Sequence, residues 1–161
     1  MIGGMKTLTV TTSSAEKTRK LGEQIAARCQ GGEVFLLNGD LGAGKTCLTQ
    51  GMARGLAIAE NVTSPTFVTH MQYIGSRGLS LEHFDFYRLD GVDVDNLDFY
   101  DFFNDPRRVC VIEWPQVIPE ILPREYVSVA ITTLAKNKRE IVLTAETPQG
   151  AVFLDGLAAT V

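Results

Sequence analysis

The chain has 161 residues, the usual size of one domain, so we predict a single domain over residues 1–161. Hydrophobic residues make up 45% and charged residues 21%, a composition that excludes disorder as the main state. The formal net charge of −4 disfavours tight independent binding to nucleic acid, because affinity for phosphate comes mainly from basic groups.

The first third of the chain has the pattern strand, helix, strand. Residues 6–10 alternate between apolar and polar and predict a short strand. Ser13 stands three residues before Glu16, an arrangement typical of a helix start, and the glycines 31–32 predict where that helix ends. The continuous apolar run 34–37 predicts a central strand that is buried on both faces.

The middle of the chain begins with a glycine-rich turn over residues 39–44. Apolar residues at every fourth position then predict a helix that starts at Lys45 or just before it. Residues 59–66 predict a polar loop. Two strand-like stretches, 67–73 and 79–87, have glycines between them and predict a β-hairpin inside an otherwise alternating β/α chain.

The last third contributes one helix and three strands to the prediction. Residues 97–103 favour a helix, and the apolar run 109–112 predicts a second buried strand that ends in Glu113. Three prolines follow and leave room for only a short helix. Strands near 127–132 and 140–145 complete the predicted sheet, whereas the last ten residues have only a weak pattern.

The cysteines and the apolar segments indicate the compartment. Cys29, Cys47 and Cys110 are widely spaced, which favours reduced thiols over a disulfide framework or a zinc site. No apolar run approaches the roughly 20 residues that span a bilayer, and the first residues lack the apolar segment of a signal peptide. We therefore expect a cytoplasmic protein that does not associate with membranes.

One motif in the chain carries clear chemistry. The run Gly39-Asp40-Leu41-Gly42-Ala43-Gly44-Lys45-Thr46 fits G-x-x-x-x-G-K-[ST] in full, between a predicted buried strand and a predicted helix. In such a turn the backbone N–H groups and the helix N-terminus form a nest for phosphate. Lys45 would contact the β- and γ-phosphates, and the Thr46 hydroxyl would ligate Mg²⁺. The alternative is a turn that binds nothing, which this crowding of glycines at a helix start disfavours.

The motif and the order of elements together define the predicted architecture. We expect an α/β, P-loop NTPase-like fold in three layers, with a mixed sheet that includes the antiparallel hairpin. We found no motif for reading guanine, which argues against a GTPase of the Ras type.

Two carboxylates are candidates for the same site. Glu113 ends a buried strand at the edge where ligands collect in open α/β sheets, so it is predicted to bind Mg²⁺; the alternative is a strand-end carboxylate facing solvent. Asp85 lies among aromatic residues and needs a partner, either a water at the metal site or Arg88 in a structural ion pair. His70 and His83 have no metal-ligand spacing.

Four sequence elements in a fixed order resemble the TsaE (YjeE) family, the small bacterial ATPases of tRNA threonylcarbamoyladenosine biosynthesis. They are GDLGAGKT at 39–46, TSPTF at 63–67, HFDFYRLD at 83–90 and IEWPQ at 112–116, and the resemblance covers about residues 13–125. It implies an ATP- and Mg²⁺-dependent ATPase that acts on or regulates a TsaB–TsaD heterodimer. The tRNA would be reached only through that heterodimer.

The resemblance also implies roles for individual residues. Lys45, Asp85 and Glu113 would be catalytic, and Thr46 and Glu113 would hold Mg²⁺, with Asp85 beside the γ-phosphate as a further candidate at the metal. Further nucleotide contacts would come from a switch loop and from flanking residues, namely Ser64, Thr66, Trp114 and Arg139.

Two other functions are compatible with the sequence. One is a small-molecule P-loop kinase, which the scarcity of basic residues for a lid disfavours. The other is a binding module in which nucleotide orders a docking surface and hydrolysis is incidental. No arginine finger is obvious among Arg54, Arg77 and Arg88, so we expect slow hydrolysis by the isolated chain, stimulated by partners.

Overall fold

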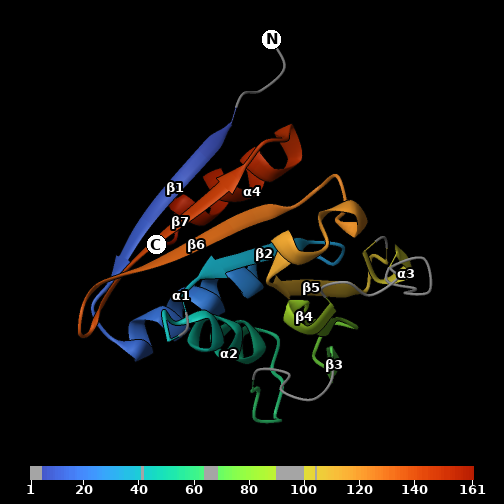
Figure 1. Cartoon of the computed structure of the whole chain (residues 1–161), viewed down its shortest axis with the longest axis horizontal. Coiled ribbons are helices and arrows are strands. Elements are labelled where there is room, and N and C mark those ends of the chain that lie inside the picture. The colour runs from blue at the N-terminus through green and yellow to red at the C-terminus, as the bar shows by residue number, and fades with distance from the viewer. Residues whose placement is uncertain (1–4, 41, 64–68, 90–99, 104) are drawn as a thin grey trace.

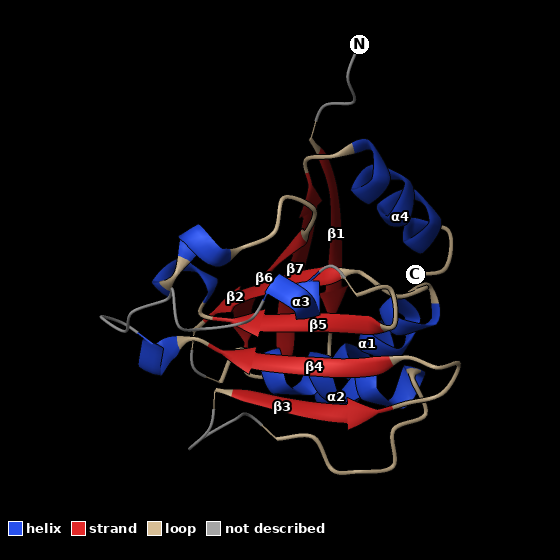
Figure 2. Ribbon diagram, turned by 90° about the vertical axis from the view of Figure 1, so that its right-hand side faces the viewer, coloured by secondary structure: helices blue, strands red, loops and turns tan. Residues whose placement is uncertain are grey.

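A computed structural model describes residues 5–40, 42–63, 69–89, 100–103 and 105–161. Its strands form one mixed sheet with the order β1-β7-β6-β2-β5-β4-β3 (Figures 1 and 2). The strands are β1 (Lys6–Thr12), β2 (Val34–Gly39), β3 (His70–Ile74), β4 (Ser80–Asp85), β5 (Arg108–Glu113), β6 (Val127–Ala135) and β7 (Lys138–Ala145). The helices are α1 (Ala15–Ala27), α2 (Lys45–Gly55), α3 (Tyr100–Phe103) and α4 (Pro148–Ala158), with short 3₁₀ turns η1 (Tyr87–Leu89), η3 (Pro115–Val117) and η4 (Pro119–Ile121).

Strand β2 lies at the centre of the sheet, parallel to both of its neighbours, β5 and β6. Its first four residues, 34–37, are all buried, which confirms the central strand that the apolar run predicted. Strand β4 is parallel to β5, whereas β3, β7 and β1 join in antiparallel fashion. The carboxyl ends of β2, β4 and β5 therefore meet at one edge of the sheet.

Helices α1, α2 and α4 cover one face of the sheet, and short helical segments cover the other, which gives the three predicted layers (Figure 2). On the first face Leu21, Leu48 and Val111 belong to one apolar cluster that α4 joins through Leu154. On the second face Phe84 lies among the residues of a smaller cluster, with Phe86, Phe103, Ile112 and Ile118.

The start of α1 corrects the sequence prediction. Ser14, and not Ser13, caps the helix: its backbone is extended and its hydroxyl accepts a hydrogen bond from the Lys17 amide at 3.1 Å. The helix begins one residue later than the pattern suggested, so Glu16 does not close a capping box. Glu16 pairs instead with Arg54 of α2 at 2.6 Å.

Helix α4 was not predicted, because the sequence pattern at the end of the chain is weak. Thr147 caps it by accepting a hydrogen bond from the Gly150 amide at 3.2 Å, and Pro148 occupies the first turn, where a missing N–H costs nothing. Leu154 and Leu157 are buried, but Val152 is 70% exposed, so the apolar residues do not mark a single face.

The remaining elements agree in type and order with the sequence prediction where the structure describes them, except that Tyr87, predicted to end the second hairpin strand, begins the turn η1. The hairpin is β3 and β4, and residues 59–63 form a loop, while residues 64–68 of the predicted loop and strand lie outside the described residues. Helix α3 falls within the predicted helix, whose first residues, 97–99, are also outside the description. Within the described ranges, none of the helices is long and apolar enough to cross a membrane.

Candidate active site

The glycine-rich turn joins the end of β2 to the first residue of α2, at the edge where the parallel strands end (Figure 1). Gly42 has φ 80° and Gly44 has φ 114°, conformations that side chains disfavour. The Ala43 amide donates to the Asp40 carbonyl at 2.9 Å and closes the turn. Gly39 ends β2, and Leu41 lies outside the described residues. The turn, residues 39–44, is named the phosphate turn after the role that its sequence predicts.

Lys45 is the first residue of α2 and is buried, with 7% of its surface exposed. Its ammonium lies 3.9 Å from Glu113 Oε1 and 4.7 Å from the centre of the Trp114 ring. A positive charge at a helix N-terminus opposes the helix dipole, so this lysine does not serve the stability of α2. Thr46 follows it in the first helical turn.

Glu113 is the last residue of β5 and is 4% exposed. The alternative interpretation, a strand-end carboxylate that faces solvent, is therefore wrong. Its β2 neighbour in the register is Leu37, two residues before Gly39. The strand register therefore places this carboxylate next to the end of β2, close to the glycine-rich turn, and its binding of Mg²⁺ stays a prediction.

Asp85 ends β4 directly beside Glu113 in the register. It is half-buried, and its Oδ1 accepts a hydrogen bond from the Tyr87 amide at 3.0 Å. None of the ion pairs found in the described part of the chain involves Asp85, and the side chain of Arg88, the partner considered from the sequence, is outside the description. Two carboxylates from neighbouring parallel strands thus end side by side at the site.

Trp114 follows Glu113 with a left-handed backbone, φ 58° and ψ 49°, which is an outlier for a bulky residue. This conformation turns the chain out of β5 and places the indole against Lys45 and against the Tyr87 ring, whose centre is 5.1 Å away. Trp114 therefore lies beside Lys45, and a contact of Trp114 with nucleotide stays a prediction.

Arg139, on β7, reaches the site from the other half of the sheet. Its Nε donates to the Ala43 carbonyl at 2.9 Å, and its Nη1 donates to the Ala135 carbonyl at 3.0 Å. The guanidinium thus contacts the outside of the phosphate turn through a backbone carbonyl. Ser64 and Thr66, the other nucleotide contacts expected from the sequence, lie outside the described residues.

The sequence analysis missed His83. This side chain is fully buried, and its Nε2 lies 2.7 Å from Glu113 Oε2. The signal was present in the sequence as His83-Phe84-Asp85, because residues two apart on a strand share a face.

The donors at the site suit magnesium. Mg²⁺ prefers oxygen ligands and is bound through one or two carboxylates plus phosphates and water. The site offers the Glu113 carboxylate and the Thr46 hydroxyl on adjacent elements. Across the described ranges, no three His, Cys, Asp or Glu side chains come together as a metal cage.

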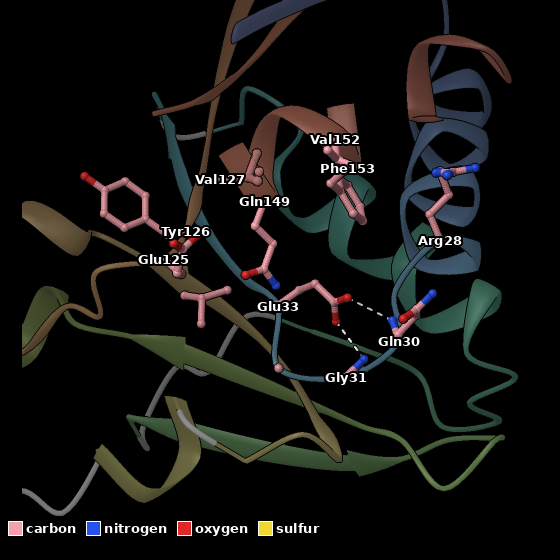
Figure 3. Close-up of a pocket in the computed structure, with 13 residues that line it drawn as sticks. Arg28, Gln30, Gly31, Glu33, Glu125, Tyr126, Val127, Gln149, Val152 and Phe153 are labelled. Atoms are coloured by element: carbon pink, nitrogen blue, oxygen red, sulfur yellow. Dashed lines mark hydrogen bonds between the residues drawn. The ribbon is translucent and has the colours of Figure 1, made fainter. Parts of the chain in front are cut away.

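A separate cavity of about 270 Å³ lies at the opposite end of β2 (Figure 3). There Glu33 accepts hydrogen bonds from the Gln30 and Gly31 amides, both at 2.8 Å, and Phe153 of α4 forms part of the wall. A six-residue strand spans roughly 20 Å, so this cavity is not part of the phosphate site.

A buried parallel strand, a turn with two left-handed glycines, a lysine at the helix start and an acid ending the next parallel strand define a P-loop NTPase-like protein. Comparison with known proteins narrows this class. The family model for threonylcarbamoyl adenosine biosynthesis protein TsaE matches residues 12–141. The chain belongs to the TsaE family.

Individual relatives and a solved structure agree with that assignment. The tRNA threonylcarbamoyladenosine biosynthesis protein TsaE of Bacillus subtilis is 38% identical over 141 residues, covering 88% of this chain and 87% of that protein. The protein of the same name from Treponema pallidum is 38% identical over 134 residues, covering 81% and 95%. The crystal structure of Bacillus subtilis YdiB matches with a TM-score of 0.80 and 32% identity, covering 98% of both chains.

Proposed function

We propose that this chain is the Mg²⁺-dependent, ATP-binding and ATP-hydrolysing component of the machinery that makes N6-threonylcarbamoyladenosine in tRNA. The observation that carries the proposal is the phosphate turn, with Lys45 at the start of α2 and Glu113 3.9 Å from its ammonium. The names of its relatives, which place them in this biosynthesis, support the choice of process.

Each residue of the site has a task in this proposal. The turn amides and the N-terminus of α2 bind the phosphates, and Lys45 turns from Glu113 and Trp114 toward the β- and γ-phosphates. Thr46 and Glu113 hold Mg²⁺, which when bound neutralises charge on those phosphates. Asp85, beside Glu113 on β4, orients the attacking water.

Hydrolysis by the isolated chain is expected to be slow, because two of the three arginines considered as fingers, Arg54 and Arg77, are engaged elsewhere, and the side chain of the third, Arg88, lies outside the description. Arg54 pairs with Glu16 at 2.6 Å, and Arg77 donates to the Cys29 and Ala26 carbonyls at 3.0 and 3.2 Å. An arginine supplied by a partner is the usual remedy in this class of protein. We propose that the partner is a TsaB–TsaD heterodimer, which also carries the tRNA, since this chain has a net charge of −4.

Calorimetric titration with Mg·ATP tests the site directly. We expect the wild-type chain to bind, and Lys45→Ala and Thr46→Ala to lose most of the affinity. Exposed Lys20→Ala on α1 serves as the control and should bind like wild type. Unchanged affinity of Lys45→Ala would refute the proposed phosphate site.

Reconstitution with the proposed partners tests the assignment to tRNA modification. ATP hydrolysis is measured for the chain alone, with TsaB–TsaD, and with TsaB–TsaD and tRNA, and we expect stimulation by the heterodimer. Phosphorylation of a metabolite without partners would indicate a kinase. Asp85→Ala is expected to lower hydrolysis more than nucleotide binding, whereas a complex that stays functional with Asp85→Ala would indicate a nucleotide-gated binding module.

A further inference from the structure

His83 is an unusual residue for its position, because its side chain is entirely buried on the helix-covered face of β4. Leu81, two residues earlier on that face, belongs to the apolar cluster beneath α1 and α2. A polar ring in such surroundings needs a specific partner to offset its desolvation. That partner is the Glu113 carboxylate of the adjacent strand.

The two oxygens of Glu113 have different neighbours. Oε2 lies 2.7 Å from His83 Nε2, whereas Oε1 lies 3.9 Å from the Lys45 ammonium. In the tautomer that carries its hydrogen on Nε2, the imidazole donates a hydrogen bond to Oε2. One oxygen is thereby held by His83, and the other lies on the side of Lys45.

His83 makes this contact and, within the described residues, no other side-chain hydrogen bond: its Nδ1 is buried without a partner. The imidazole is therefore not one link in a larger stabilising network. The spacing of His83 and Asp85 on one strand puts the imidazole behind Glu113 and the second carboxylate beside it.

We propose that His83 is a positioning residue of the metal site, which holds Glu113 so that Oε1 alone is presented to Mg²⁺. The inference rests on the proposed function, since it assigns the same Glu113 to the metal. Hydrogen-bond partners behind metal ligands fix the ligand's orientation, and losing one costs metal affinity about 10- to 100-fold.

The test measures metal binding separately from nucleotide binding. ADP affinity is measured by calorimetry in EDTA, and Mn²⁺ affinity is measured on the ADP complex by electron paramagnetic resonance of the free ion. For His83→Leu we expect at least about a 10-fold loss of Mn²⁺ affinity. ADP affinity in EDTA should stay within about twofold of wild type, because the amides that bind phosphate are untouched.

Three further variants complete the design. His83→Gln places an amide N–H near the original Nε2 and should recover most of the Mn²⁺ affinity, whereas the shorter His83→Asn should not. His70→Leu is the matched control: His70 is the chain's other histidine, lies on the opposite face of the sheet against Phe84, and should leave both affinities unchanged. If His83→Leu fails to fold, the Mn²⁺ affinities of His83→Gln and His83→Asn are compared instead, and equal affinities would overturn the proposal.

The outcomes distinguish a failure of the proposed function from a failure of the proposed role of His83. Wild-type protein that binds neither ADP nor Mn²⁺ would overturn the proposed function and this inference with it. Wild-type protein that binds both, with His83→Leu keeping full Mn²⁺ affinity, would overturn the inference alone. Equal losses of ADP and Mn²⁺ affinity would show a merely structural role and also overturn it.

Discussion

At the scale of single residues, Trp114 is held in a conformation that its side chain disfavours. A left-handed backbone costs an ordinary residue roughly 1–2 kcal/mol, and Trp114 has φ 58°. Its ring meets Lys45 and Tyr87, so the strain coincides with contacts at the phosphate site. Backbone strain of this kind concentrates where function requires a fixed geometry.

Trp114 is the only tryptophan of the chain, which makes it a built-in reporter. We expect Mg·ADP to change its fluorescence, because Lys45, now 4.7 Å from the ring centre, must leave the indole to reach phosphate. Lys45→Ala should alter the starting emission and abolish the response. An unchanged response in that variant would mean that the signal does not come from this contact.

Gly42 has φ 80°, and a Cβ added there would meet nothing within 4 Å. The cost of Gly42→Ala is therefore conformational, and we expect it to lower the free energy of unfolding by about 1 kcal/mol, measured in urea. Gly42→Asn should cost less, because asparagine tolerates the left-handed region. Equal losses for the two variants would contradict this explanation.

At the scale of elements, the packing of α1 against α2 depends on glycines at the helix contact. A Cβ on Gly51 would lie 1.9 Å from the Arg19 carbonyl oxygen, and one on Gly22 would lie 2.3 Å from the Leu48 carbonyl oxygen. The two backbones approach too closely for any side chain. Since α2 starts at the phosphate turn, this contact fixes where its N-terminus points.

Gly51→Ala is expected to destabilise the protein by about 2 kcal/mol, although alanine favours helix by about 1 kcal/mol, because the helices must separate. The same exchange in α4, Gly156→Ala, is the matched control. There the three atoms nearest to an added Cβ belong to the flexible Arg28 guanidinium, which can move away, so the unfolding free energy should stay level or rise. Urea denaturation measures the unfolding free energy of both variants. Equal values for the two would contradict the explanation by close helix contact.

The turn that leads into β5 depends on Asp105. Hydrogen bonds from the Arg107 guanidinium and amide, and then from Arg108, lower the pKa of Asp105 to about 2. The unfolded pKa is about 3.9, so the folded pKa is depressed. The stabilisation is therefore fully present above pH 4 and lost as the pH falls toward 2.

Asp105→Asn should consequently lower stability at pH 7 and cost much less near pH 2, where about half of the Asp105 carboxyl is protonated in the folded state. Urea unfolding at the two pH values measures the contrast, and an NMR titration of the Asp105 carboxyl should give a midpoint near 2. Exposed Asp155→Asn on α4, which pairs with Lys6, is a suitable control. A loss of equal size at both pH values would mean that ionisation of Asp105 is not the cause.

At the scale of the whole molecule, the three cysteines differ in how the fold covers them. Cys29 and Cys110 are buried, and burial raises the pKa of both thiols, whereas Cys47 is half-buried beside Thr46. We expect one thiol to react quickly with a thiol reagent in the native state, and three in denaturant. Mg·ADP should slow that one reaction, and Cys47→Ser should remove it.

Much of this arrangement was predictable from the sequence, because it depends on local patterns. The apolar run at 34–37 and the glycine turn after it defined the centre of the sheet and the phosphate turn. The position of Arg139 against Ala43 and of His83 behind Glu113 depends on strand pairing between distant segments, which periodicity does not contain. Helix α4 was not predicted, because its apolar residues lie around the helix and do not mark one face.

The pairing of β1 with β7 has a consequence for biosynthesis. Lys6 lies opposite Ala145, so β1 waits for β7 to be synthesised before this pairing can form. Strand β2 likewise waits for β5 and β6. Contacts this distant along a chain form late and slowly, so the glycine-rich turn after β2 stays without its surrounding sheet until β5 and β6 have been translated.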